Sequence, residues 1–221
     1  DALINLCKMK THALERVTGG VKNLYGCISG LHKAKGHTKY TNADIFARQL
    51  IDLNQLIKPR FCVMDGIVAM DGNGPTSGDP VKMKVLLLGN DPVAIDSVYC
   101  HLVHLDPQMV PTNVHGETMG LGTWREENIR LLTDGGEITM QEAVERFGNP
   151  DFNVDRKKQR GNLWNRFNNG FLRYFQKKPY IEAYKCKKCG VCVEACPVEG
   201  KALQFKNGRR KPPVYNYHKC I

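Results

Sequence analysis

The chain has 221 residues, 42% of them hydrophobic, and a formal net charge of +10 at pH 7. Its densest apolar stretch, Val85–Leu88, is far shorter than the roughly 20 residues that a bilayer-spanning helix needs, so the sequence argues against a transmembrane segment. The length suffices for one substantial core and a small second unit, and we expect a cytoplasmic protein.

Positive charge is concentrated in the C-terminal third of the chain. Residues 1–155 hold 15 basic and 19 acidic side chains, residues 156–178 hold eight basic and no acidic ones, and residues 179–221 hold nine basic and three acidic ones. This distribution indicates a local interaction surface in that third rather than a generally cationic protein.

Strand-like and helix-like patterns alternate over residues 1–150, which predicts a layered α/β core domain. The helix starts are marked by Asn42, by Asp91–Pro92 and by a capping box of Thr139 and Glu142. In chain order we expect a strand at 2–7, a helix at 43–57, strands at 60–70 and 81–88, a helix at 92–105, a strand at 129–132 and a helix at 139–147.

Residues 151–178 form a basic, aromatic linker, which we expect to be helical. On a helix, one face would carry Trp164, Phe167, Phe171, Tyr174 and Phe175. We expect this face to dock on one of the two units. The alternative is a helix that lies on a membrane surface or on an acidic partner, because its opposite face is purely cationic.

Residues 179–221 contain a regular cysteine run, Cys186-x2-Cys189-x2-Cys192-x3-Cys196, followed by Pro197. This spacing is typical of bacterial-type ferredoxins, in which three thiolates wrap one iron–sulfur cluster and the fourth binds another. A structural zinc site is the alternative, but zinc sites usually use two CxxC pairs with a longer gap between them. We therefore predict a small α+β ferredoxin-like module.

A second copy of the motif begins and stops at the end of the sequence. An offset of 34 residues places Cys186 on Cys220, one residue before Ile221. We expect Cys186, Cys189 and Cys192 to hold a first 4Fe–4S cluster, and Cys196 with Cys220 to contribute to a second one. The module in this chain is therefore incomplete. A single cluster completed by some other thiol is the alternative.

The remaining cysteines lie far from that run and from one another. Because none has a nearby ligand partner in the sequence, we expect these cysteines to be buried and to pack as small hydrophobic residues. They are Cys7, Cys27, Cys62 and Cys100.

Several further motifs lie in the first 150 residues: Lys8–His12, Thr18–Gly26, Met64–Pro75, Asn90–Asp96 and Gly120–Gly122. With the cysteine run, they make the chain resemble the bacterial and archaeal family named domain of unknown function 362, over essentially all of its length. The resemblance implies a C-terminal module with two 4Fe–4S clusters, and no settled reaction. It also implies a further α/β portion upstream, so we expect the start at Asp1 to be a cut N-terminus.

Polar residues of these motifs are candidates for a second site. An anion pocket could be formed by Lys8, Lys10, Thr11, His12, Lys22 and Asn23, although ordinary solvated lysines explain the same residues. Asp65 and Asp71 lie beside glycines at expected strand ends, where α/β sheets place ligands and where tight turns also occur.

The candidate catalytic residues are Lys10, His12, Asp65 and Asp71. A lone histidine such as His12 is more often structural than catalytic. We assign Asp91 to helix capping and Asp96 to the first turn of the same helix.

Three functions follow from these features. The first is electron transfer by an iron–sulfur protein, as a redox-enzyme component with an acidic redox partner. The second is an oxidoreductase that acts on a small anionic ligand at the α/β domain and takes electrons from the clusters. The third is a nucleic-acid- or membrane-binding protein with a structural or sensory cluster. We favour the first, and expect no nucleic acid partner.

Overall fold

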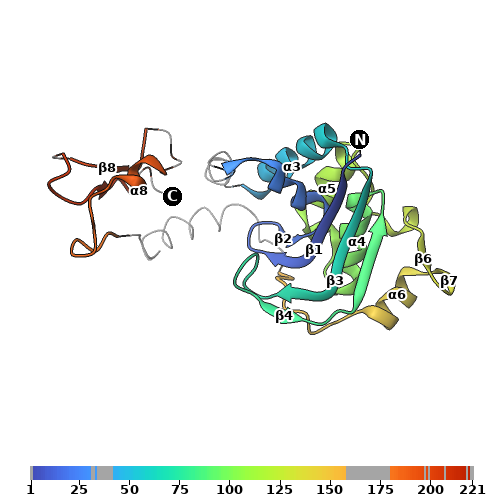
Figure 1. Cartoon of the computed structure of the whole chain (residues 1–221). Coiled ribbons are helices and arrows are strands. Elements are labelled where there is room, and N and C mark those ends of the chain that lie inside the picture. The colour runs from blue at the N-terminus through green and yellow to red at the C-terminus, as the bar shows by residue number, and fades with distance from the viewer. Residues whose placement is uncertain are drawn as a thin grey trace. The chain divides into compact units, whose positions relative to one another are not determined.

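The structure is a computed structural model that describes residues 2–30, 33, 42–157, 180–196, 198, 200–206, 208–217 and 219. The chain divides into two compact units (Figure 1). Unit 1 holds residues 1–28 and 40–157, and unit 2 holds residues 29–39 and 158–221. Most of the linker expected at 151–178 lies outside the described residues.

A five-stranded mixed sheet forms the centre of unit 1, which confirms the α/β class. Its strands are β1 (Ile4–His12), β2 (Arg16–Thr18), β3 (Phe61–Asp71), β4 (Asp79–Val81) and β5 (Val85–Gly89). β1 pairs in parallel with β3 and antiparallel with β2, while β3 also pairs antiparallel with β4 and β5.

Two of the expected strands differ from the structure by more than two residues. The strand expected at 2–7 continues to His12. The strand expected at 81–88 is two strands, β4 and β5, because Lys84 adopts a left-handed conformation with φ of 59° between them. Strand geometry cannot continue through such a residue.

The described part of the connection from β2 to β3 contains two α-helices with assigned bounds, and a parallel pair of strands needs a crossover of this kind. They are α1 (Gly20–Asn23), followed by the 3-10 helix η1 (Leu24–Cys27), and α3 (Ala43–Ile57). Asn42 caps α3 as predicted, because its side chain accepts a hydrogen bond from Ile45 N.

The second half of unit 1 is mostly helical. It contains α4 (Pro92–Leu102), η2 (Pro107–Met109), α5 (Pro111–Thr118), η3 (Glu126–Asn128), the hairpin β6 (Leu131–Thr133) and β7 (Gly136–Ile138), and α6 (Met140–Phe147). The capping box of Thr139 and Glu142 is present. α4 ends three residues before the expected Leu105, because His104 has a φ of 53°.

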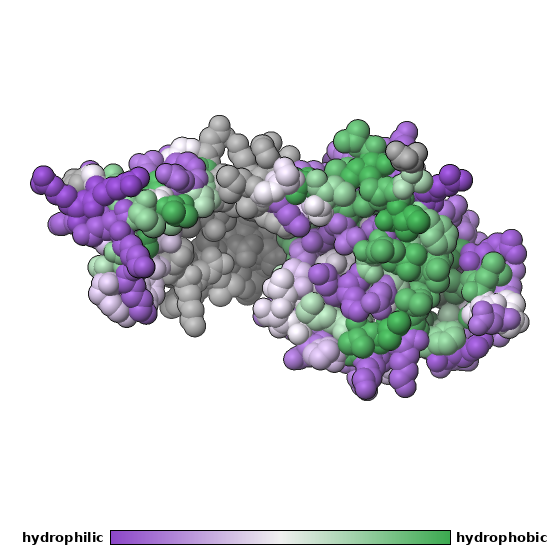
Figure 2. Space-filling model, viewed as in Figure 1, coloured by the Kyte–Doolittle hydropathy of each residue, from purple (hydrophilic) through white to green (hydrophobic). Residues whose placement is uncertain are grey.

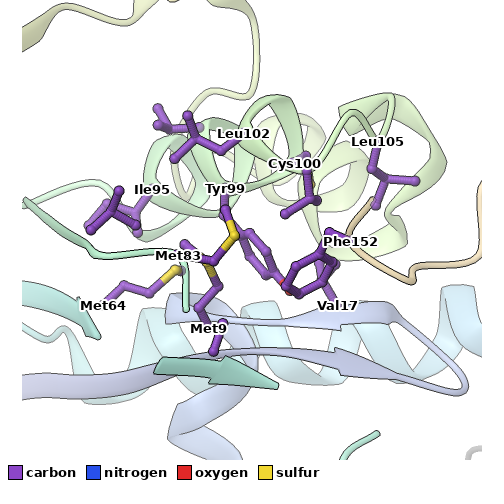
Figure 3. Packing of buried hydrophobic residues seen from close by; sticks show 14 of the residues in the cluster. Met9, Val17, Met64, Met83, Ile95, Tyr99, Cys100, Leu102, Leu105 and Phe152 are labelled. Atoms are coloured by element: carbon purple, nitrogen blue, oxygen red, sulfur yellow. The ribbon is translucent and has the colours of Figure 1, made fainter. Parts of the chain in front are cut away.

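The core of unit 1 lies between the sheet and α4 (Figure 3). Met9 and Met64 come from the sheet, and Tyr99 of α4 packs edge to face on Phe152 with ring centroids 6.1 Å apart. Three of the four scattered cysteines are buried as predicted: Cys7, Cys62 and Cys100. The prediction is wrong for Cys27, which is exposed at the end of η1.

The opposite face of the sheet is apolar and open among the described residues. Alternation along the strands exposes Ile4 and Leu6 on β1, Phe61 on β3, and Leu86 and Leu88 on β5, with Leu6 exposed to 71%. Figure 2 shows a hydrophobic area on this side of unit 1. Parallel strand pairs usually lie in sheets that are covered on both faces, so this face is the least typical part of the fold.

Unit 2 has little regular structure among its described residues. A short helix, α8 (Val191–Glu194), precedes an antiparallel pair formed by β8 (Leu203–Gln204) and β9 (Val214–Tyr215). In the part of the chain that the structure describes, no helix combines the length and hydrophobicity needed to cross a bilayer.

Candidate functional site

The cysteine run comprises a surface loop with Cys186 and Cys189, the short helix α8 with Cys192, and the turn after it with Cys196. Cys189 and Cys192 are exposed, whereas Cys186 and Cys196 are half-buried. Gly190 lies between Cys189 and Cys192, at the N-cap of α8, and adopts a left-handed conformation with φ of 89°, which glycine adopts without strain. The loop therefore turns sharply at Gly190 and leaves two thiols accessible at its surface.

The thiol of Cys196 lies against backbone N–H groups of the segment that follows it. Ala202 N donates to Cys196 Sγ at 3.3 Å. Partial burial acts to raise the pKa of Cys196, but the N–H groups of Val198, Ala202 and Leu203 and the charge of Lys201 outweigh it and lower the pKa. The thiolate, which is the form that binds metals, is thereby favoured.

Lys201 also fixes the backbone of this loop. Its ammonium donates hydrogen bonds to the carbonyl oxygens of Glu194 and Cys196, both at 2.9 Å. Lys201 itself has a φ of 49°, so a strained residue holds the turn after Cys196.

The residues of this loop fit an iron–sulfur cluster in donor chemistry, because they supply thiols that are closely spaced in the sequence and N–H groups directed at the sulfur of Cys196. Within the described ranges, however, no three His, Cys, Asp or Glu side chains converge as a ready ligand set. Cys220 and Pro197 lie outside the described residues.

The second group of candidates lies on the central strands of unit 1. Asp65 lies opposite Lys8 in the β1–β3 register, and the two form an ion pair at 2.7 Å. The hydrogen bond from Lys8 and a second one from Ile67 N lower the pKa of Asp65. Asp65 is therefore a surface carboxylate that is ionised and already paired.

His12 stabilises the turn after β1. Its Nδ1 accepts hydrogen bonds from the backbone N–H groups of Leu14 at 3.2 Å and Glu15 at 3.1 Å. An imidazole nitrogen that accepts two N–H groups carries no proton of its own. In this arrangement His12 supports the tight connection between β1 and β2.

Asp71 ties the end of β3 to the segment near residue 153. It is buried, and its Oδ2 accepts a hydrogen bond from Asn153 N at 2.8 Å. Beside it lies an open groove of about 520 Å³, whose described lining is Gly72, Asn73 and Asn153–Lys157.

The four catalytic candidates do not meet in this groove, since none of them belongs to its described lining. Lys10 lies opposite Met70, next to Asp71 along β3, whereas Asp65 pairs with Lys8 further down the strands. The structure therefore divides the candidates between a surface ion pair, a turn and a strand end.

The two aspartates of α4 have different roles. Asp91 caps α4 as predicted, through hydrogen bonds from Val93 N and Ala94 N, and its second oxygen accepts one from Thr123 N. The assignment of Asp96 to the first turn of α4 is wrong, because the first turn contains no acidic residue.

Asp96 instead binds α1. It is fully buried, and its two carboxylate oxygens accept hydrogen bonds from the backbone N–H groups of Gly20 and Val21. Burial raises the pKa of Asp96 to about 7 in spite of these donors. The local sequence around Asp96 gives no signal of this contact, because its partners lie 76 and 75 residues away.

Glu15 is a buried acid that the sequence did not single out. Its side chain is fully buried, and neither carboxylate oxygen has a hydrogen-bond partner among the described residues. Burial is the main reason that the pKa of Glu15 is raised to about 8, with Lys22 lowering it and Asp44 raising it further.

Comparison with known proteins identifies two parts of the chain. Residues 1–101 match the family described as domain of unknown function (DUF362), and residues 179–200 match the 4Fe-4S binding domain. This confirms the resemblance that the motifs indicated. The thylakoid-associated protein sll1697 of Synechocystis sp. is 40% identical over 141 residues, which make up 63% of this chain and 44% of that protein. No solved structure matches the chain.

Proposed function

We propose that the chain, which contains a 4Fe-4S binding domain, belongs to a protein that transfers electrons as a component of a redox enzyme. In this proposal Cys186, Cys189 and Cys192 bind one cluster, and Cys196 binds a second one together with Cys220. A bound 4Fe–4S cluster would accept and release electrons one at a time.

The observation that carries the proposal is the cysteine run inside the matched domain, with backbone N–H groups directed at one of its thiols. Such N–H groups stabilise thiolate charge and influence the reduction potential of a cluster that the thiolates hold. The exposed position of Cys189 and Cys192 supports exchange of electrons with another protein at the surface.

A reducing compartment suits this chemistry. The eight cysteines that the structure describes are all free thiols, including Cys7 and Cys62, whose sulfur atoms lie only 3.7 Å apart. Free thiols persist where glutathione and thioredoxin keep proteins reduced. We propose that the protein works in a reducing compartment such as the cytoplasm.

Anaerobic reconstitution with iron and sulfide tests this proposal. We expect the chain to take up both, and Cys189→Ala to lose most of this capacity because it removes a cluster ligand. Cys27→Ala is the matched control, since Cys27 is an exposed free thiol outside the run. Uptake of zinc in preference to iron, or equal iron content in the Cys189 and Cys27 variants, would refute the assignment of these ligands.

A further inference from the structure

Several cations lie close to the loop that carries the exposed thiols. Lys187 and Lys188 lie between Cys186 and Cys189 in the sequence, and Lys187 is exposed. A Cβ placed on Gly190 would lie 3.0 Å from Arg209 Nη2, so the guanidinium of Arg209 covers this glycine from another part of unit 2.

The β8–β9 connection supplies further positive charge. Antiparallel pairing of β8 with β9 folds this connection back on itself, and it carries the exposed side chains of Lys206, Arg209, Arg210 and Lys211. Figure 2 shows hydrophilic residues over much of the visible surface of unit 2.

These cations are not neutralised by carboxylates within the described part of unit 2. Glu182 pairs with Lys185, and Lys201 donates to backbone carbonyl oxygens. Among the described residues, no ion pair involves Lys187, Lys188 or Arg209. Fixed cations that keep no internal partner are available to carboxylates of another molecule.

We propose that the cations around Gly190 form a docking surface for an acidic electron-carrier protein. This inference rests on the proposed function and specifies its partner. The partner presents carboxylates around its own redox centre, and these pair with Lys187, Lys188 and Arg209 beside the exposed thiols of Cys189 and Cys192. Charge complementarity of this kind increases the association rate and fixes orientation while leaving the complex short-lived.

An acidic protein suits this surface better than another polyanion does. The cations lie beside thiols that are exposed within a 4Fe-4S binding domain, and only a redox protein makes use of both features. A nucleic acid or an anionic membrane would use the charge alone.

Binding of an acidic flavodoxin to the reconstituted full chain tests the inference, with basic cytochrome c as the comparison probe. We expect flavodoxin to bind and cytochrome c not to bind. We also expect flavodoxin affinity to fall when the salt concentration rises from about 50 to about 300 mM, because salt screens exposed charges. The triple variant Lys187→Gln, Lys188→Gln, Arg209→Gln should bind flavodoxin roughly 10- to 100-fold more weakly, at roughly two- to fivefold per cation.

The matched control replaces three exposed cations of unit 1, as Arg48→Gln, Arg60→Gln, Lys82→Gln, and should keep wild-type affinity. Iron and sulfide content is measured for every variant. A chain without iron would defeat the proposed function, whereas an iron-loaded chain whose two triple variants bind flavodoxin equally would defeat only this inference. Tighter binding of duplex DNA or anionic vesicles than of flavodoxin, with the same sensitivity to the Lys187 triple variant, would also overturn it.

Discussion

Asp96 Oδ1 accepts a 2.5 Å hydrogen bond from the backbone N–H of Gly20, although 76 residues separate them along the chain. The second oxygen accepts one from Val21 N at 3.1 Å. No side chain at the start of α1 caps this helix, so the carboxylate of Asp96, which lies on α4, accepts the hydrogen bonds of the first N–H groups of α1. It joins the beginning of the β1–β3 crossover to α4.

We predict that Asp96→Asn destabilises unit 1 by about 1–3 kcal/mol, because an amide side chain can accept only one of the two N–H groups and leaves the other buried without a partner. Urea denaturation monitored by circular dichroism measures the change. Asp52→Asn, at an exposed position on α3, is the control. Equal midpoints for the two variants would show that the Asp96 contact contributes nothing.

Local signals and distant contacts differ in how well the sequence predicts them. Asn42, Asp91 and Thr139 cap their helices as expected, because a cap is decided within three residues of the helix start. The role of Asp96 depends on Gly20 and Val21, which are distant in the sequence and which the fold brings near. β2, with three residues, and η1, with four, are too short to show a periodicity.

The candidate sites show the same division. The spacing of the cysteine run alone predicts a 4Fe–4S cluster, and the match to a 4Fe-4S binding domain agrees with this prediction. Asp65 is a candidate because it lies beside a glycine in the sequence, but in the structure it forms an ion pair with Lys8 on the adjacent strand. No sequence pattern predicts the burial of Glu15, because burial of one acid in a turn depends on the packing of the whole unit.

Glu15 makes stability depend on pH. Its pKa is about 8 in the folded chain and near the ordinary glutamate value of 4.5 in the unfolded chain, so the unfolded state releases the proton more readily. The stability that Glu15 contributes is therefore fully present below about pH 4.5 and is lost as pH rises through about 8. Thermal unfolding of Glu15→Gln should show a smaller fall in Tm than the wild type between about pH 6 and pH 9.

Asp96 contributes in the same direction but in a lower window, up to about pH 7, so the Glu15→Gln variant should keep this part of the pH dependence. Parallel Tm curves for the wild type and Glu15→Gln between about pH 6 and pH 8 would mean that Glu15 does not have a raised pKa in the folded chain.

Two glycines of the β2–η1 region should differ in how much stability the same substitution costs. A Cβ on Gly19 would collide with the Asp96 carboxylate and lie 2.5 Å from Met64 Cε, whereas a Cβ on Gly26 would meet nothing within 4 Å. We predict that Gly19→Ala costs about 3 kcal/mol or more, and that Gly26→Ala changes stability by less than about 1 kcal/mol.

Thermal denaturation of the two purified variants decides this prediction. If Gly19→Ala fails to accumulate as folded protein while Gly26→Ala does, the steric account is supported as well. Similar melting temperatures for both variants would contradict the close packing of Gly19 on Asp96.

The central claim is that the cysteine run holds a cluster that changes its redox state. Low-temperature electron paramagnetic resonance of the reconstituted chain, recorded before and after reduction with dithionite, tests it most directly. We predict a signal that appears on reduction, disappears on reoxidation and is absent from Cys189→Ala. An iron-loaded chain whose spectrum does not change on reduction would contradict electron transfer by this module.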